Sequence, residues 1–145
     1  METKTNWLAL VVSAVVGMAL GMLWYGFLFT NQWMAGNGIT MDAAGAAMKN
    51  GAPMGHSSLP MIVNAVSLLV YAYLMNWLVN KTSSFDLKSG AILGAVIGTI
   101  HIFGIYTGNR FAGNPVSLSM VDGFYTFIMF TVMGAIIGMW RPKAA

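Results

Sequence analysis

The chain has 145 residues, of which 57% are hydrophobic and only 8% are charged, and its mean hydropathy is +0.70. A soluble globular domain carries about 25% charged residues, so this composition excludes an ordinary water-soluble fold. The net charge of +3 comes from scattered basic residues, which excludes nucleic-acid binding and suits a lipid bilayer with anionic headgroups. Cysteine is absent, which excludes disulfides, thiolate nucleophiles and Cys-ligated metals.

Four long apolar stretches fill most of the chain, and nearly every charge lies at or between their ends. Each has about 20 residues and, at ~1.5 Å per helical residue, crosses a hydrocarbon layer ~30 Å thick. We therefore predict an all-α polytopic membrane protein, one domain with four transmembrane helices over residues 7–29, 59–79, 88–108 and 120–140. The first stretch is longer than the ~7 to 15 apolar residues of a signal peptide, so we expect it to be retained.

The connection over residues 30–58 is long enough to hold structure outside the spans. We predict a short outer interfacial helix from Thr40 to Asn50. Asp42 in its first turn and Lys49 in its last complement the helix dipole, and Gly51 follows its end. Such a helix would lie on the membrane surface or over the mouth of the bundle.

The ends of the spans carry helix-start signals. The segments from Ser83 to Asp86 and from Ser119 to Asp122 have the spacing of a capping box, which predicts helix starts before the third and fourth spans. Proline near a helix start costs little, and this suits Pro60 and Pro115.

Basic residues are unequally divided between the two sides of the predicted bundle. The positive-inside rule places both termini in the cytoplasm. The residues on the side of the termini are Lys4, Lys81, Lys88, Arg141 and Lys143, against Lys49 and Arg110 on the other side.

Glycines recur at intervals of four on three spans. Lipid provides no hydrophobic drive for pairing helices, so close backbone approach at small residues is expected to hold them together. These faces serve packing within the bundle or between subunits, and we expect a homo-oligomer or a larger membrane complex. The predicted packing residues are Gly17, Gly21, Gly90, Gly94, Gly98, Gly134 and Gly138.

Polar and aromatic side chains collect in the half of the spans that is predicted to face outward. This candidate ligand cluster contains Trp24, Tyr25, Asn64, Ser67, His101, Tyr106, Asp122 and Tyr125. An ionisable residue inside a span is a candidate for function. His101 either donates a hydrogen bond as a neutral core residue or serves in ligand binding, a proton relay or a pigment contact. Asp122 is either a helix cap paired with Arg110 or an ion or proton site.

The other members of this cluster have similar alternatives. Trp24 and Tyr25 belong to an interfacial aromatic belt or the core, or they line a substrate site. Asn64, Ser67 and Tyr71 share one helical face, where they form hydrogen bonds between helices or line a conduction path.

No cofactor is predicted, and no metal apart from one weak alternative. Met54 and His56 offer a thioether beside an imidazole, which suits Cu(I), but methionine is also a common filler of apolar interfaces. The acidic residues are divided between the two sides of the membrane, and no nucleophile, paired-carboxylate or phosphate-loop pattern is evident. We therefore do not expect an enzyme.

The segment from Asn6 to Ala9, the stretch Gly17-x3-Gly21-x2-Trp24-Tyr25-Gly26-x-Leu28-Phe29 and the pair Trp33-Met34 resemble the start of a known family. Gly123-x-Tyr125 and the stretch from Met133 to Trp140 resemble its end. This is the bacterial membrane family catalogued as domain of unknown function 1761. The resemblance implies a four-span inner-membrane protein without an assigned activity. Phe27 stands where a proline is common in the family, and Asp122 where an uncharged polar residue is expected.

Two functions follow from these patterns. The first is a structural or accessory subunit that packs by its glycine faces into a homo-oligomer or a larger membrane complex. The alternative is a transporter or channel for small solutes or ions, with an outward-facing polar cavity around His101 and Asp122. The inner halves of the spans are almost wholly apolar or glycine, which favours the accessory subunit.

Overall fold

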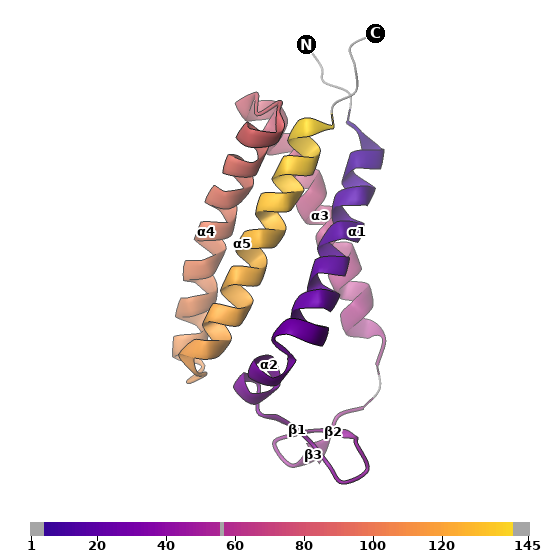
Figure 1. The fold of residues 1–145 in the computed structure, drawn as a ribbon, viewed down its shortest axis with the longest axis vertical. Coiled ribbons are helices and arrows are strands. Elements are labelled where there is room, and N and C mark those ends of the chain that lie inside the picture. The colour runs from indigo at the N-terminus through magenta and orange to yellow at the C-terminus, as the bar shows by residue number, and fades with distance from the viewer. Residues whose placement is uncertain (1–4, 56, 141–145) are drawn as a thin grey trace.

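The computed structural model describes residues 5–55 and 57–140. Within these residues four long helices run side by side (Figure 1): α1 (Trp7–Leu23), α3 (Leu59–Thr82), α4 (Leu87–Phe111) and α5 (Val116–Met139). The π-helix η1 (Trp24–Leu28) extends α1 by a further turn. Each of the four is long and apolar enough to cross a membrane. The prediction of an all-α fold with four spans is therefore confirmed.

The bundle has two distinct ends (Figure 1). At the terminal end α1 begins, α5 ends and α3 turns into α4. Asn6 connects the start of α1 to the end of α5 at this end. Its side chain accepts a hydrogen bond from the Ala9 amide at 3.1 Å and donates one to the Trp140 carbonyl at 2.8 Å. The predicted orientation rests partly on Lys4, Arg141 and Lys143, which lie outside the described residues, so it stays a prediction.

The opposite end, the sheet end, holds the connection between α1 and α3. Helix α2 (Thr30–Gly36) is followed by three short strands, β1 (Ile39–Met41), β2 (Ala47–Lys49) and β3 (Ala52–Pro53). They form an antiparallel sheet in the order β1-β2-β3, with Thr40 opposite Met48 and Lys49 opposite Ala52.

The prediction of a helix from Thr40 to Asn50 was wrong, and the short helix of this connection lies at α2 instead. The Asp42 carboxylate accepts from the amides of Ala44 and Ala46 at 2.9 and 2.8 Å, and so closes a turn. Gly45 has a φ of 80°, which glycine adopts at little cost. An Asp side chain that bonds its own backbone competes with helix formation, and here it produces a hairpin.

Helix α4 does begin with a capping box, but three residues later than expected. The Asp86 side chain accepts from the amides of Lys88 at 2.8 Å and Ser89 at 3.0 Å, and the Ser89 hydroxyl lies 3.4 Å from the Asp86 amide. Ser83 instead ends α3 with a left-handed backbone, at a φ of 55°. The Asp therefore acts as the cap itself and not as the distant partner of a serine.

The capping box predicted from Ser119 to Asp122 was also wrong, because α5 begins at Val116. Pro115 occupies the N-cap position and sets the start of the helix. Both Ser119 and Asp122 consequently lie inside α5. Pro60 stands in the first turn of α3, as predicted.

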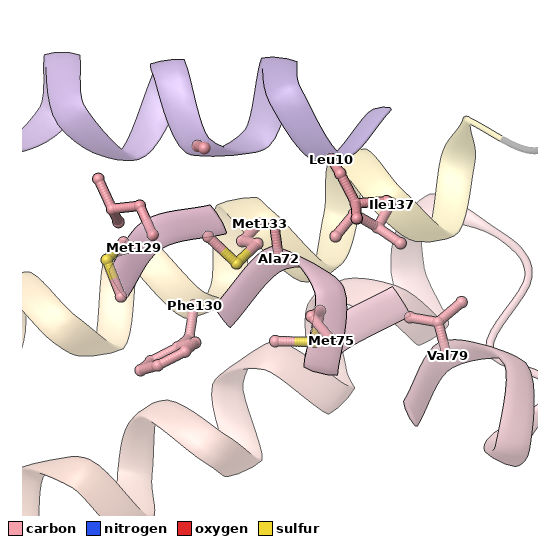
Figure 2. Close-up of a cluster of buried hydrophobic side chains, with 10 residues drawn as sticks. Leu10, Ala72, Met75, Val79, Met129, Phe130, Met133 and Ile137 are labelled. Carbon is pink, nitrogen blue, oxygen red and sulfur yellow. The ribbon is translucent and has the colours of Figure 1, made fainter. Parts of the chain in front are cut away.

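The apolar core lies between α1, α3 and α5 (Figure 2). Its buried members are Leu10, Ala14, Leu68, Ala72, Met75, Val79, Met129, Phe130, Met133 and Ile137. None of them comes from α4, whose fully buried residues are all glycines. Helix α4 contributes only the partly buried Leu93 and Ile97, which pack against this core. On its outer side the exposed apolar residues, as suits a surface in lipid, are Ile92, Val96, Ile100 and Phe103.

Helix α4 is held against α5 by what we call the glycine seam, formed by Gly90, Gly94 and Gly98 of α4 with Gly134 and Gly138 of α5. A Cβ atom added to Gly90 would overlap the Gly134 carbonyl, and one added to Gly94 would overlap the carbonyl of Phe130. At Gly98 it would lie 2.6 Å from the Phe127 Cα. The two backbones are thus as close as glycine alone permits.

The predicted glycines of α1 also face neighbours within the chain. A Cβ atom on Gly17 would lie 3.0 Å from the Leu68 side chain, and one on Gly21 would lie 3.1 Å from the Tyr125 hydroxyl. The neighbours are side chains here and backbone in the glycine seam. All seven glycines selected from the sequence therefore lie against other helices or connections of the same chain.

Candidate functional site

The Trp-Tyr-Gly sequence forms the π-helix η1. The Phe29 amide donates to the Trp24 carbonyl at 2.8 Å, and the Thr30 hydroxyl donates to the Tyr25 carbonyl at 2.7 Å. A short π-helix of this kind corresponds to one extra residue in an α-helix and is often found at functional sites. Here it is followed by α2 and brings two consecutive aromatic residues, Trp24 and Tyr25, into contact with α5.

Trp24 and Tyr25 both bond to the start of α5. The Trp24 indole N–H donates to the Val121 carbonyl at 2.9 Å, and the Tyr25 hydroxyl donates to Asp122 Oδ1 at 3.1 Å. The ring of Tyr125 lies 5.0 Å from that of Tyr25, centroid to centroid. Trp24, Tyr25, Asp122 and Tyr125, which were selected from the sequence as candidates, are thus brought together as one cluster.

Asp122 and Arg110 are not paired in the described part of the chain. The guanidinium of Arg110 lies 6.0 Å from the ring centroid of Tyr106, at the end of α4. Asp122 lies within α5 and bonds to Tyr25. The expected cap paired with Arg110 is therefore replaced by a hydrogen bond to η1.

A cleft of about 420 Å³ lies between α3 and α4, whose backbones come close at few positions, and α5 forms its floor. It runs from the sheet end to the middle of the bundle. Its lining residues are Pro60, Val63, Asn64, Ser67, Tyr71, His101, Tyr125, Thr126, Met129 and Phe130. Four residues of the candidate ligand cluster, from three helices, therefore meet at one cleft.

The cleft is lined by polar side chains that have no hydrogen-bond partner among residues 5–55 and 57–140. Asn64, Ser67 and Tyr71 follow one face of α3, and His101 faces them from α4. By contrast, the Tyr125 hydroxyl is already used, since it donates to the Gly17 carbonyl at 3.2 Å. The side chains of Asn64, Ser67, Tyr71 and His101 remain available to a bound molecule.

Aromatic rings close the deep end of the cleft. The His101 ring lies 4.7 Å from that of Phe130, and the Tyr71 ring lies 5.3 Å from that of Phe130 and 6.4 Å from that of His101. Phe130 points away from α1 and towards α4 (Figure 2). Beyond these rings the core continues with Met75 and Met133, which are 1% exposed. These rings and methionines lie between the cleft and the terminal end of the bundle.

The family model described as protein of unknown function (DUF1761) matches residues 8–138. The chain belongs to this family. The match confirms the resemblance that the Trp-Tyr-Gly segment and the end of α5 predict. Comparison with curated proteins and with solved structures finds no match.

In this member of DUF1761, η1 and the whole cleft lie inside the matched segment. Phe27, which stands where the resemblance leads one to expect proline, is an exposed residue of η1. Asp122, the other departure, is the acceptor for Tyr25. The second departure therefore has a local structural role.

Two candidates lie elsewhere. Tyr106 is 40% exposed near the end of α4 and lies under Arg110, outside the cleft. Met54 is exposed after β3, and its possible copper partner His56 is outside the described residues. Apart from Tyr106, the candidate ligand cluster divides into the η1 contact and the cleft, which share Tyr125.

Some lining residues were missed by the sequence prediction. Thr126, Met129 and Phe130 form the floor of the cleft, but each is an ordinary residue for a transmembrane helix. Their one sequence signal is that they follow Tyr125 within about a turn and a half of α5.

Proposed function

We propose that this protein is a membrane-embedded binding protein that takes a lipid-soluble small molecule from the bilayer into the cleft between α3 and α4. The unpartnered polar side chains of the cleft carry this proposal. A polar group that meets only hydrocarbon costs free energy, so polar residues in spans normally pair with each other or face a functional cavity. Asn64, Ser67 and His101 are of the second kind, because they line the cleft.

The shape of the cleft favours access from the side of the bundle. Val63 lines the cleft and is 54% exposed, on a helix surface that suits lipid. Towards the terminal end, the rings of Tyr71, His101 and Phe130 and the methionine core behind them leave no polar route. This geometry supports binding over conduction, which the transporter alternative requires.

Cysteine accessibility tests this proposal, because the chain contains no cysteine of its own. Ser67→Cys places a thiol in the cleft, Ala72→Cys a thiol in the core at 0% exposure, and Val66→Cys a thiol on the lipid side. In proteoliposomes we expect the thiols at 67 and 66 to react with a membrane-soluble phenylmercury salt, which bonds to the sulfur of a protonated thiol and releases the proton with the anion of the salt. The thiol at 72 should stay unreactive. A membrane-impermeant thiosulfonate should label none of them rapidly.

Two outcomes would contradict the proposal. Rapid labelling at position 67 by the impermeant reagent from both sides of the membrane would indicate a water-filled path and favour a transporter. Failure of both reagents at position 67, with position 66 reactive, would show that the cleft is closed.

A second candidate function is the accessory subunit favoured by the sequence. Gly104 and Gly108 of α4 support it, since a Cβ atom on either would meet nothing within 4 Å. Small residues four apart on an exposed face allow another helix to approach closely. Gly104→Ile and Gly108→Ile should then dissociate an assembly purified in mild detergent, as measured by light scattering. An unchanged mass would count against this role.

A further inference from the structure

Resting on the proposed function, we propose that the ligand of the cleft is a neutral amphipathic molecule of the quinone class, with a planar ring head that accepts hydrogen bonds and an apolar tail. The observations behind this choice are the charge, the hydrogen-bonding groups, the rings and the opening of the cleft.

The charge of the cleft excludes an ionic headgroup. None of its lining residues is Lys, Arg, Asp or Glu. A phosphate or ammonium group taken into such a site would lose its hydration without gaining a counter-charge, at a large cost in free energy. A phospholipid headgroup and an inorganic ion therefore fit poorly, whereas a neutral polar head loses less.

The unpartnered side chains can all donate hydrogen bonds. The amide of Asn64 and the hydroxyls of Ser67 and Tyr71 do so from α3, and one ring nitrogen of His101 does so from α4. Along α3 the three positions are spaced by ~4.5 and ~6 Å, at ~1.5 Å per residue. These spacings are comparable with the width of a six-membered ring that carries a carbonyl oxygen at each end.

The rings at the deep end favour a flat, polarisable head. Tyr71, His101 and Phe130 surround this end with centroid separations of 4.7 to 6.4 Å. Aromatic side chains of this kind pack on a planar ring in stacked or edge-to-face arrangements. The volume of about 420 Å³ falls within the ~300–1,000 Å³ typical of small-molecule sites.

The opening of the cleft accounts for the tail. Between α3 and α4 the walls towards the lipid are apolar, with Pro60 and Val63 at the edge. A hydrocarbon or isoprenoid chain would leave the cleft past Val63 and continue into the bilayer, so only the head needs to be enclosed.

The experiment measures thermal unfolding of the full chain in detergent with four probes. They are decylubiquinone, its ring without the decyl tail, dodecanol and dioleoyl phosphatidylglycerol. We expect decylubiquinone at saturation to raise Tm by about 5 °C and the other three to have little effect. The loss of one hydrogen bond in Asn64→Leu or Ser67→Ala should weaken decylubiquinone binding about tenfold.

Asn80→Leu is the matched control, because it makes the same change on α3 ~24 Å further along the helix and away from the cleft. It should bind decylubiquinone as the unmodified chain does. Equal weakening by Asn64→Leu and Asn80→Leu would overturn the inference, since the cleft would then not be the site.

Other results would also overturn it, and they separate the ligand class from the cleft. Stabilisation by phosphatidylglycerol that is lost in Asn64→Leu would leave a ligand-binding cleft but exclude a neutral ring. No stabilisation by any probe, with Ser67→Cys still labelled from the lipid, would exclude the quinone class alone. An unreactive Ser67→Cys would remove the proposed function and this inference together.

Discussion

The two sides of α4 are packed in opposite ways. Towards α5, the glycine seam brings the two backbones into direct contact at Gly90, Gly94 and Gly98. Towards α3, the two backbones come close at few positions, and a cleft of about 420 Å³ lies between the helices. Because the glycine seam already packs α4 against α5, the position of α4 does not depend on contacts with α3. The cleft between α3 and α4 is therefore compatible with a bound ligand.

The contrast also has an energetic meaning. In lipid, helices associate through close van der Waals contact, which glycine permits along its whole face. The cleft instead leaves hydrogen-bonding groups of Asn64, Ser67 and His101 without partners in the part of the chain that the structure describes, which a structure selected for stability alone would avoid. The seam thus supplies stability, and the cleft has the features of a site. Substitutions on the two sides of α4 should therefore behave differently.

The largest effect is expected in the seam. A side chain at Gly94 would collide with the backbone of Phe130, which cannot move as a side chain can. Overpacking that side chains can absorb costs ~1–3 kcal/mol, and Gly94→Val should exceed this range. The change is measured as a loss of folded protein, or as a fall of Tm in detergent. Gly104→Val on the same helix is the control, because a Cβ atom there meets nothing within 4 Å. Its Tm should equal that of the unmodified chain.

A mild response to Gly94→Val, similar to that of Gly104→Val, would contradict the seam. It would mean that the backbones of α4 and α5 are not in direct contact, so that α4 would not be packed more closely against α5 than against α3.

A smaller effect is expected where η1 meets α5. Tyr25→Phe removes the hydrogen bond to Asp122 and leaves a half-buried carboxylate with one partner fewer. A buried group that loses its partner costs ~1–3 kcal/mol, and the free energy of unfolding should fall by about that amount. Tyr73→Phe removes an exposed hydroxyl without a partner in the described residues and should change little. Equal values for the two variants would show that the Tyr25 bond does not hold η1 in place.

The architecture could be read from the sequence, whereas the pairing of the helices could not. Uninterrupted apolar runs fix the number of spans, because any polar backbone in hydrocarbon must be satisfied within a helix. The glycine intervals mark faces for close packing but do not name the partner. Only the structure shows that Gly94 meets Phe130 of α5 and that Gly17 meets Leu68 of α3.

The errors and omissions have local causes. Asp42 was assigned to a helix dipole, but its carboxylate bonds two amides of a turn. The polar members of the cleft were predictable, since polar residues stand out in apolar spans. Phe130 was not, because a phenylalanine in a transmembrane helix gives no indication of whether it faces lipid, core or a cleft.

The response of the terminal end to acid gives a finer test, because Asp86 caps α4 there. Hydrogen bonds from the Ser89 side chain and backbone, with the Lys88 amide, hold the pKa of Asp86 below its ordinary value of 3.8. Its stabilisation is thus present above the unfolded-state pKa and is lost as pH falls through the lower folded-state pKa. Asp86→Asn keeps a capping side chain that does not titrate. Its stability should match the unmodified chain at pH 7 and fall less below about pH 4.

That comparison requires Tm to be measured against pH for both proteins in one detergent. Parallel curves down to pH 3 would show that Asp86 does not contribute to the acid sensitivity of this end.

The smallest effect is expected in the cleft, and it completes the contrast between the two sides of α4. Ser67→Ala removes a hydroxyl that has no partner in the described chain, so the free energy of unfolding of the ligand-free protein should be unchanged or slightly higher. Ser89→Ala makes the same chemical change at the capping box, where the hydroxyl donates to Asp86 at 2.7 Å. It should lower the free energy of unfolding, because it removes a bond that is made in the folded chain. Chemical unfolding in mixed micelles measures both. A loss at Ser67 as large as that at Ser89 would mean that the Ser67 hydroxyl is already bonded within the folded chain, and the cleft would then have one fewer group to offer a ligand.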